Sequence, residues 1–139
     1  MLLKHQFFND YSETAHPACL QAVAHKSEQQ QIGYGLDEIS ARARDLIQAQ
    51  IHAPAAEIHF CSGGTQANLT VIGSMLRPHE AVIAVESGHI ATHETGAIEA
   101  TGHKVIHVPH VHGKLTPEAA ARALTAHPNE HSVKPRMLF

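Results

Sequence analysis

Hydrophobic residues recur along this chain at two spacings, one typical of helices and one typical of buried strands. The Ala-Val-Ile-Ala-Val run at 81–85 is nearly unbroken, as expected of a strand that is covered on both faces. Elsewhere apolar residues return every three or four positions, which predicts helices. The pattern predicts helices over 17–29, 37–50, 65–76, 90–101 and 116–126, and strands over 57–61, 81–85, 104–108 and from 136 onward.

Residues suited to helix ends stand at the predicted boundaries. Pro17 fits the first turn of the first helix, and Asp37 or a near neighbour can cap the second. Gly102 follows the fourth predicted helix as a natural C-terminal cap. Thr116 and Pro117 supply an N-cap and a first helical residue for the last helix.

Strands and helices alternate in this prediction, and short links join them. Such alternation indicates an α/β domain with a largely parallel sheet and flanking helices. Because crossovers between parallel strands are right-handed, the loops that follow the strands gather at one edge of the sheet, where open α/β folds bind ligands. We therefore expect residues 62–65, residues 86–89 and the strand end near Pro109 to share that edge.

Composition narrows the class of protein. The 139 residues are 43% hydrophobic and 17% charged, which is typical of a globular chain long enough for one domain. The formal net charge is -3 without a run of lysine or arginine, so no nucleic-acid partner is expected. No apolar stretch is long enough to cross a bilayer, so no membrane partner is expected. Cys19 and Cys61 are widely separated, which favours a reducing, cytoplasmic location.

The 14 histidines invite a metal-site hypothesis. His89 and His93 are four positions apart and can share one face of a helix. His107, His110 and His112 form a second group near a predicted strand end. Neither group has an acidic or cysteine partner at a recognised ligand spacing, so we predict no metal site and favour a histidine-rich surface.

Residues 62–68, Ser-Gly-Gly-Thr-Gln-Ala-Asn, join a predicted strand to a predicted helix. Free backbone N–H groups and the helix dipole favour an anion at such a helix N-terminus. Gly63 and Gly64 allow a ligand to approach the backbone closely, and Thr65 adds a hydroxyl donor. The turn therefore suggests a bound phosphate. It matches neither a P-loop nor a G-x-G-x-x-G dinucleotide site, and a tight strand-to-helix connection is the alternative.

His89 follows a predicted strand on the same edge of the sheet as Gly64. At that position it could stack on a flat ring whose phosphate lies in the glycine turn. The alternative is that His89 caps the helix that follows. Glu94 and Asp10 are the candidate carboxylates for polar contacts nearby, although single acidic residues are usually solvated surface groups.

A series of short motifs occurs in order along the chain, at 8–12, 16–17, 34–37, 62–68, 88–90, 93–97 and 113–116. Together they resemble the N-terminal part of the threonine aldolase and β-eliminating lyase family. Members of that family are pyridoxal 5'-phosphate (PLP) enzymes of the aspartate-aminotransferase fold, or fold type I. The resemblance covers essentially the whole chain. It implies an N-terminal segment over 1–35 and the α/β core of a partial large domain over 36–139.

The resemblance also implies roles for individual residues. Gly64 and Thr65 match the positions that hold the phosphate of PLP. His89 matches the histidine that stacks on the cofactor ring and assists catalysis. Asp10 and Ser12 match family positions near the substrate carboxylate. Tyr34 matches a position in an active-site loop close to the dimer interface. A homo-oligomer is therefore implied as well.

The reaction that the resemblance implies is cleavage of threonine or allo-threonine to glycine and acetaldehyde. Family members are much longer than this chain, and three of their residues lie beyond the matched region. These are the lysine that binds PLP covalently, the aspartate that pairs with the pyridine nitrogen and an arginine for the substrate carboxylate. No lysine of this chain occupies the family position. We therefore expect a truncated family member that binds PLP weakly and is inactive or nearly so by itself.

Two alternatives differ from a truncated aldolase. One is a non-catalytic association or scaffold domain that retains the fold. The other is a different PLP-dependent β-eliminating lyase, because the residues that distinguish these activities lie beyond the matched region.

Overall fold

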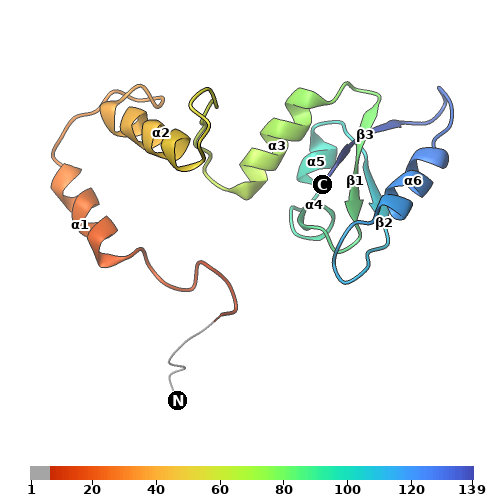
Figure 1. Ribbon diagram of the computed structural model, residues 1–139, viewed down its shortest axis with the longest axis horizontal. Coiled ribbons are helices and arrows are strands. Elements are labelled where there is room, and N and C mark those ends of the chain that lie inside the picture. The colour runs from red at the N-terminus through yellow and green to blue at the C-terminus, as the bar shows by residue number, and fades with distance from the viewer. Residues whose placement is uncertain (1–6) are drawn as a thin grey trace, which may run out of the picture. The chain divides into compact units, whose positions relative to one another are not determined.

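The computed structural model describes residues 7–139, and the chain divides into two units, Met1–Ile58 and His59–Phe139. The first unit holds two helices, α1 (Pro17–Lys26) and α2 (Glu38–Gln50), and none of its described residues is buried. The second unit holds a sheet, its flanking helices and the buried core of the described chain (Figure 1). The predicted division of the chain after residue 35 stays a prediction.

Helix α1 begins at Pro17, as predicted, but it ends at Lys26 rather than near Gln29. The backbone amides of Ser27 and Gln29 donate to carbonyls three residues earlier, which is turn bonding rather than α-helical bonding. The chain therefore leaves the helix about one turn sooner than the apolar pattern indicated.

Helix α2 confirms its prediction, and Asp37 is its N-cap. One carboxylate oxygen accepts from the Ser40 amide at 2.8 Å, and the other accepts from the Ser40 hydroxyl at 2.7 Å. The hydroxyl and the amide of Ser40 favour the charged form and hold the pKa of Asp37 below its ordinary value. The guanidinium of Arg44 donates to the Gly35 carbonyl at 2.9 Å and so ties the preceding loop to the helix.

Three parallel strands form the sheet of the second unit. They are β1 (Glu80–Val85), β2 (Val105–Val108) and β3 (Lys134–Leu138), in the order β2-β1-β3. Because β1 lies between the other two, residues 81–85 are all buried, which is why that run is apolar on both faces. The predicted α/β class with a parallel sheet is confirmed.

Helices cover both faces of this sheet, which gives the second unit three layers (Figure 1). Helices α3 (Gly64–Met75), α4 (His89–Thr92) and α5 (Ala97–Ala100) pack on one face, and α6 (Pro117–Thr125) packs on the other. Burying one large aliphatic side chain contributes about 1.5–3 kcal/mol. The largest fully buried side chains, from both faces, are Ile72, Ile83, Ile98 and Val82.

Glu80 begins β1 and holds the link between α3 and the sheet. Its Oε2 accepts from the Arg77 backbone amide at 2.9 Å, and its Oε1 lies 3.7 Å from Nε of Arg136 on β3. The hydrogen bond from the Arg77 amide is the main reason that the pKa of Glu80 lies below its ordinary value. Partial burial opposes this effect, and the charges of His79, Arg136 and Arg77 add to it.

The predicted strand at 57–61 is wrong. These residues adopt no regular secondary structure and join no strand of the described sheet. Their β-favouring side chains do not suffice, because a strand is stabilised by hydrogen bonds to a neighbouring strand. The boundary between the two units also falls within this segment.

The prediction of a single helix over 90–101 is also wrong, because this segment forms two short helices, α4 and α5. Helix α4 ends at Thr92, and Thr95 and Gly96 adopt left-handed backbone conformations, with φ of 52° and 77°, which separate it from α5. The break turns Glu94 into the interior, where its side chain is buried. Gly102 follows α5 with φ of 89°, in the C-terminal position expected for it.

Within residues 7–139, the structure contains no helix with the length and apolar character needed to cross a membrane.

Candidate functional site

The glycine turn at 62–65 forms the N-terminus of α3. Gly63 is the N-cap with extended backbone, and no side chain caps the helix there. The first helical hydrogen bond runs from the Ala67 amide to the Gly63 carbonyl, so the amides of residues 64–66 precede the helical ladder. The Ser62 amide, by contrast, donates to the Gln66 side chain at 2.6 Å.

Open space surrounds the two glycines of this turn. A Cβ atom added at Gly63 or at Gly64 would meet no atom of the described chain within 4 Å. Exposed backbone amides, the half-buried Thr65 and this open space form a donor set that fits a phosphate group. On the chemistry of these residues, the phosphate end of PLP fits the turn.

His89 lies just beyond the carboxyl end of β1. The Gly88 amide donates to the Val85 carbonyl at 2.7 Å, and this tight turn leads directly into α4, whose first residue is His89. The Glu86 amide donates to the Val108 carbonyl at 2.9 Å, so the ends of β1 and β2 lie side by side. The prediction that residues 86–89 and the strand end near Pro109 share one edge is confirmed. For residues 62–65, which follow no strand, a place on that edge stays a prediction.

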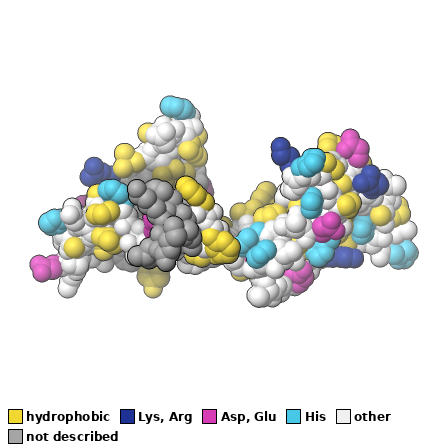
Figure 2. Space-filling model, turned by 90° about the horizontal axis from the view of Figure 1, so that it is seen from below, with side chains coloured by type: hydrophobic (Ala, Val, Ile, Leu, Met, Phe, Trp, Pro, Cys, Tyr) yellow, Lys and Arg dark blue, Asp and Glu magenta, His cyan; other side chains and the backbone are white. Residues whose placement is uncertain are grey.

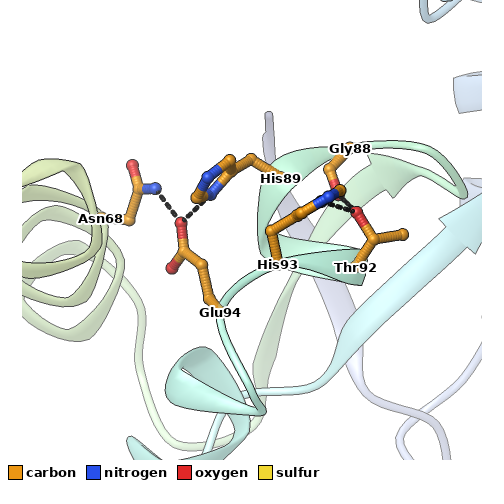
Figure 3. Close-up of polar contacts among 6 residues, drawn as sticks. All are labelled: Asn68, Gly88, His89, Thr92, His93 and Glu94. Carbon is orange, nitrogen blue, oxygen red and sulfur yellow. Dashed lines mark hydrogen bonds and ion pairs between the residues drawn. The ribbon is translucent and has the colours of Figure 1, made fainter. Parts of the chain in front are cut away.

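A buried carboxylate connects His89 to α3. Oε1 of Glu94 lies 2.7 Å from Nδ1 of His89 and accepts from the Asn68 side-chain amide at 2.6 Å (Figure 3). The Glu94 side chain is 0% exposed, whereas that of His89 is 58% exposed. Among residues 7–139, Oε2 of Glu94 has no hydrogen-bond partner. Glu94 therefore makes the polar contact for which it was a candidate in the sequence.

The ring of His93 packs against the ring of His89. The two rings stack with centroids 5.5 Å apart and an interplanar angle of 23°. The Thr92 hydroxyl donates to the Gly88 carbonyl at 3.0 Å, and it lies 2.5 Å from Nδ1 of His93 (Figure 3). Because that hydroxyl has one proton, it accepts from His93. The ring of His93 is thus held in place beside His89.

The structure brings only some of the predicted site residues together. Gly64, Thr65 and His89 lie in the second unit, where Asn68 and Glu94 connect α3 to the segment that carries His89. Sequence reasoning gave Asn68 no role. The sequence places Asn68 on the predicted helix one turn after Thr65. Spacing along the chain could not predict that its partner would be Glu94.

The three predicted substrate residues lie in the first unit. Asp10 is exposed, and the Ser12 hydroxyl donates to the Asn9 side chain at 2.7 Å. Tyr34 is 102% exposed and has a left-handed backbone with φ of 64°, which is uncommon for a bulky residue. The predicted proximity of Asp10 to His89 stays a prediction, because these residues belong to different units.

The histidines among residues 7–139 do not gather into one cluster. Figure 2 shows them scattered over the visible surface. Within the described chain, no group of three or more His, Cys, Asp or Glu side chains has the arrangement of a metal site.

Comparison with known proteins identifies the family. The sequence pattern of the beta-eliminating lyases matches residues 10–139. The low specificity L-threonine aldolase of Pseudomonas aeruginosa (strain PAO1) is 30% identical over 135 residues, and that of Pseudomonas sp. (strain NCIMB 10558) is 29% identical. Each match covers 96% of this chain and 39% of the relative.

A solved structure of Leishmania major threonine aldolase also matches. It is 48% identical with a TM-score of 0.90, and the match covers 94% of this chain and 38% of that one. The predicted partial fold type I domain is thereby confirmed. The chain spans about two fifths of the length of the relatives that it matches. With a family match over nearly all of its residues, the chain belongs to the beta-eliminating lyase family.

Proposed function

We propose that this chain is part of a PLP-dependent threonine aldolase, a carbon–carbon lyase that cleaves threonine or allo-threonine to glycine and acetaldehyde. The observation that carries the proposal is the 48% identity to Leishmania major threonine aldolase over 94% of this chain. The family match at 10–139 includes Gly64, Thr65 and His89, so the residues proposed for the site lie inside it.

In this proposal, α3 binds the cofactor phosphate. The amides at 64 and 65 and the Thr65 hydroxyl donate to the phosphate oxygens, and the absence of a side chain at Gly64 leaves room for them. The N-terminal dipole of α3 favours the negative charge. PLP, when bound, supplies an electron sink for the electron pair of the bond that breaks.

His89 stacks on the cofactor ring in this proposal and moves a proton. Its contact with Glu94 uses Nδ1 and leaves Nε2 directed elsewhere. Nε2 can accept the proton of the substrate β-hydroxyl as the carbonyl of acetaldehyde forms. One face of the ring lies against His93, so the opposite face is the one proposed to meet the cofactor.

Asp10, Ser12 and Tyr34 are proposed to contact the amino acid substrate. Support comes from their positions in the family motifs at 8–12 and 34–37. All three side chains are exposed and take no part in the core. Family resemblance also supports a homo-oligomer in which Tyr34 lies near the interface. Exposed apolar residues on α2 and at its C-cap, namely Ile39, Leu46 and the cap residue Ile51, are consistent with such association.

A cytoplasmic location belongs to the same proposal and is supported by the two free thiols, Cys19 and Cys61.

Size-exclusion chromatography with light-scattering detection tests the proposed homo-oligomer. A dimer or larger species is expected, and a monomer at all concentrations would exclude a stable homo-oligomer of this chain.

Binding of the phosphate is best tested with a probe that cannot react with lysine. Pyridoxine 5'-phosphate has the ring and the phosphate of PLP but no aldehyde. Titration into ¹⁵N-labelled protein should shift the backbone amide signals of residues 64–66 and the ring signals of His89. Inorganic phosphate should shift only the amides, and pyridoxine, which has no phosphate, should leave them nearly unchanged.

Gly64→Ala is the matched variant. Its methyl group meets no protein atom, so the fold should be retained, but the methyl lies where the phosphate is proposed to bind. The amide shifts should weaken in this variant and persist in His89→Ala. If pyridoxine 5'-phosphate shifts none of these amides, or shifts them equally in Gly64→Ala, the phosphate site is wrong.

Turnover by this chain alone is expected to be absent or nearly so, because none of its lysines matches the family lysine. Release of acetaldehyde from threonine by the purified 139-residue protein with added PLP would contradict that expectation. The family description itself favours a second candidate, β-elimination from an amino acid. Turnover that releases ammonia rather than acetaldehyde from an amino acid would support it.

A further inference from the structure

Glu94 is placed where an isolated carboxylate would be costly. Its side chain is fully buried in the link between α4 and α5, and the next two residues, Thr95 and Gly96, adopt left-handed backbone conformations. A buried polar atom without a partner loses its hydrogen bonds to water and gains none in return, and Oε2 of Glu94 is such an atom among the described residues. An apolar side chain would avoid this cost, so the carboxylate at position 94 points to a role in hydrogen bonding.

The partners of Glu94 determine the direction of its hydrogen bonds. A carboxylate oxygen only accepts, and Oε1 accepts from the Asn68 amide at 2.6 Å. The same oxygen lies 2.7 Å from Nδ1 of His89, so Nδ1 must carry a proton and donate it. In a neutral imidazole the other nitrogen then has a lone pair. Nε2 of His89 is left as an acceptor on a ring that is more than half exposed.

We propose that Glu94 is a positioning residue that fixes His89 in the tautomer with the proton on Nδ1. Asn68 anchors the carboxylate from α3, and the carboxylate then fixes both the rotation of the ring and the location of its proton (Figure 3). Resting on the proposed function, this arrangement keeps Nε2 ready to accept the β-hydroxyl proton of the substrate. The tautomer itself is a property of this chain without any ligand.

Ring ¹⁵N NMR of histidine-labelled protein tests the proposal directly. Spectra are recorded without ligand at alkaline pH, and the His89 signals are assigned by comparison with His89→Asn. The expected result is a protonated Nδ1 and an unprotonated Nε2. A wild-type His89 ring with a bare Nδ1 and a proton on Nε2 would overturn the proposal without any variant.

Variants then separate positioning from simple structural support. Glu94→Met removes the acceptor with little change in length, and the His89 proton should move to Nε2. Glu94→Gln keeps an oxygen acceptor and should keep the proton on Nδ1. Asn68→Ala removes the anchor and should lower thermal stability, yet the Nδ1 proton should be retained. A His89 tautomer that is the same in Glu94→Met as in the wild type would contradict the proposal.

The titration with pyridoxine 5'-phosphate keeps the two proposals apart. If the tautomer is as expected but the probe shifts no amide at 64–66, the proposed function fails and the role of Glu94 stands. If the probe binds but His89 has its proton on Nε2, Glu94 does not position the ring and the cofactor site stands.

Discussion

The side-chain amide of Asn68 donates to Oε1 of Glu94 at 2.6 Å, although 26 residues separate them. Asn68 lies on α3, one turn after Thr65, and Glu94 lies in the break between α4 and α5. This single contact therefore connects the helix that begins with the glycine turn to the segment that begins with His89. The candidate phosphate-binding residues and the candidate catalytic histidine are held within one unit of the structure.

Removal of buried volume from α3 should destabilise the second unit. Ile72 is 2% exposed and packs against the sheet, so Ile72→Ala should lower the free energy of unfolding by about 2–5 kcal/mol. Its neighbour Val71 is 49% exposed, and Val71→Ala should change that free energy by less than about 1 kcal/mol. Urea denaturation of both variants gives the comparison. Equal effects would contradict the assignment of the core face of α3.

The Asp37 cap should be needed for α2. Asp37→Ala removes both hydrogen bonds to Ser40, so helix content by circular dichroism and protection of the α2 amides from hydrogen exchange should fall. Asp37→Asn keeps an acceptor and should retain most of the helix. Asp45→Ala, which removes a carboxylate from the middle of the same helix, is the control and should cause no loss.

A fall in pH should reduce the contribution of Glu80 to the stability of the fold. Its folded-state pKa lies below the ordinary value, so its contribution to stability is present above the ordinary glutamate pKa of about 4.3 and is lost as the pH falls through the lowered value. The denaturation midpoint of the wild type should therefore exceed that of Glu80→Gln at neutral pH. The two midpoints should converge as the pH falls below that lowered pKa. Glu99→Gln, which removes an exposed carboxylate from α5, is the control and should leave the midpoint at neutral pH close to that of the wild type.

Gly88 should not tolerate a side chain. A Cβ atom there would lie 2.9 Å from the Val85 carbonyl oxygen, so the turn that carries His89 must shift in Gly88→Ala, at a cost of about 1–3 kcal/mol. The His89 amide signal should move in the same variant. Gly63→Ala is the control, because its backbone is extended and its Cβ would meet no described atom. A Gly88→Ala protein as stable as Gly63→Ala would show that the turn can adjust freely.

Local sequence patterns predicted most of the elements because their causes are local. The cap at Asp37, the proline at the start of α1 and the glycine after α5 act within one turn of the backbone. The apolar run at 81–85 predicted a strand buried on both faces, because only a central parallel strand favours apolar residues at every position. The family motifs named Gly64, Thr65 and His89 as one candidate site.

Where sequence prediction failed, the cause was tertiary. Residues 57–61 have strand-like composition, but a strand needs a neighbour, and the described sheet offers them none. The apolar spacing from 90 to 101 suited one helix, yet the chain breaks at Thr95 and Gly96 so that Glu94 can face inward.

The sequence by itself therefore determined most of the element types and the parallel α/β class, because backbone propensity and capping act over a few residues. Only the tertiary structure decided that Asn68, Glu94 and His89 share one hydrogen-bonded cluster. Hydrogen bonds between residues far apart in the chain depend on how helices pack against the sheet, and no spacing along the sequence encodes that packing.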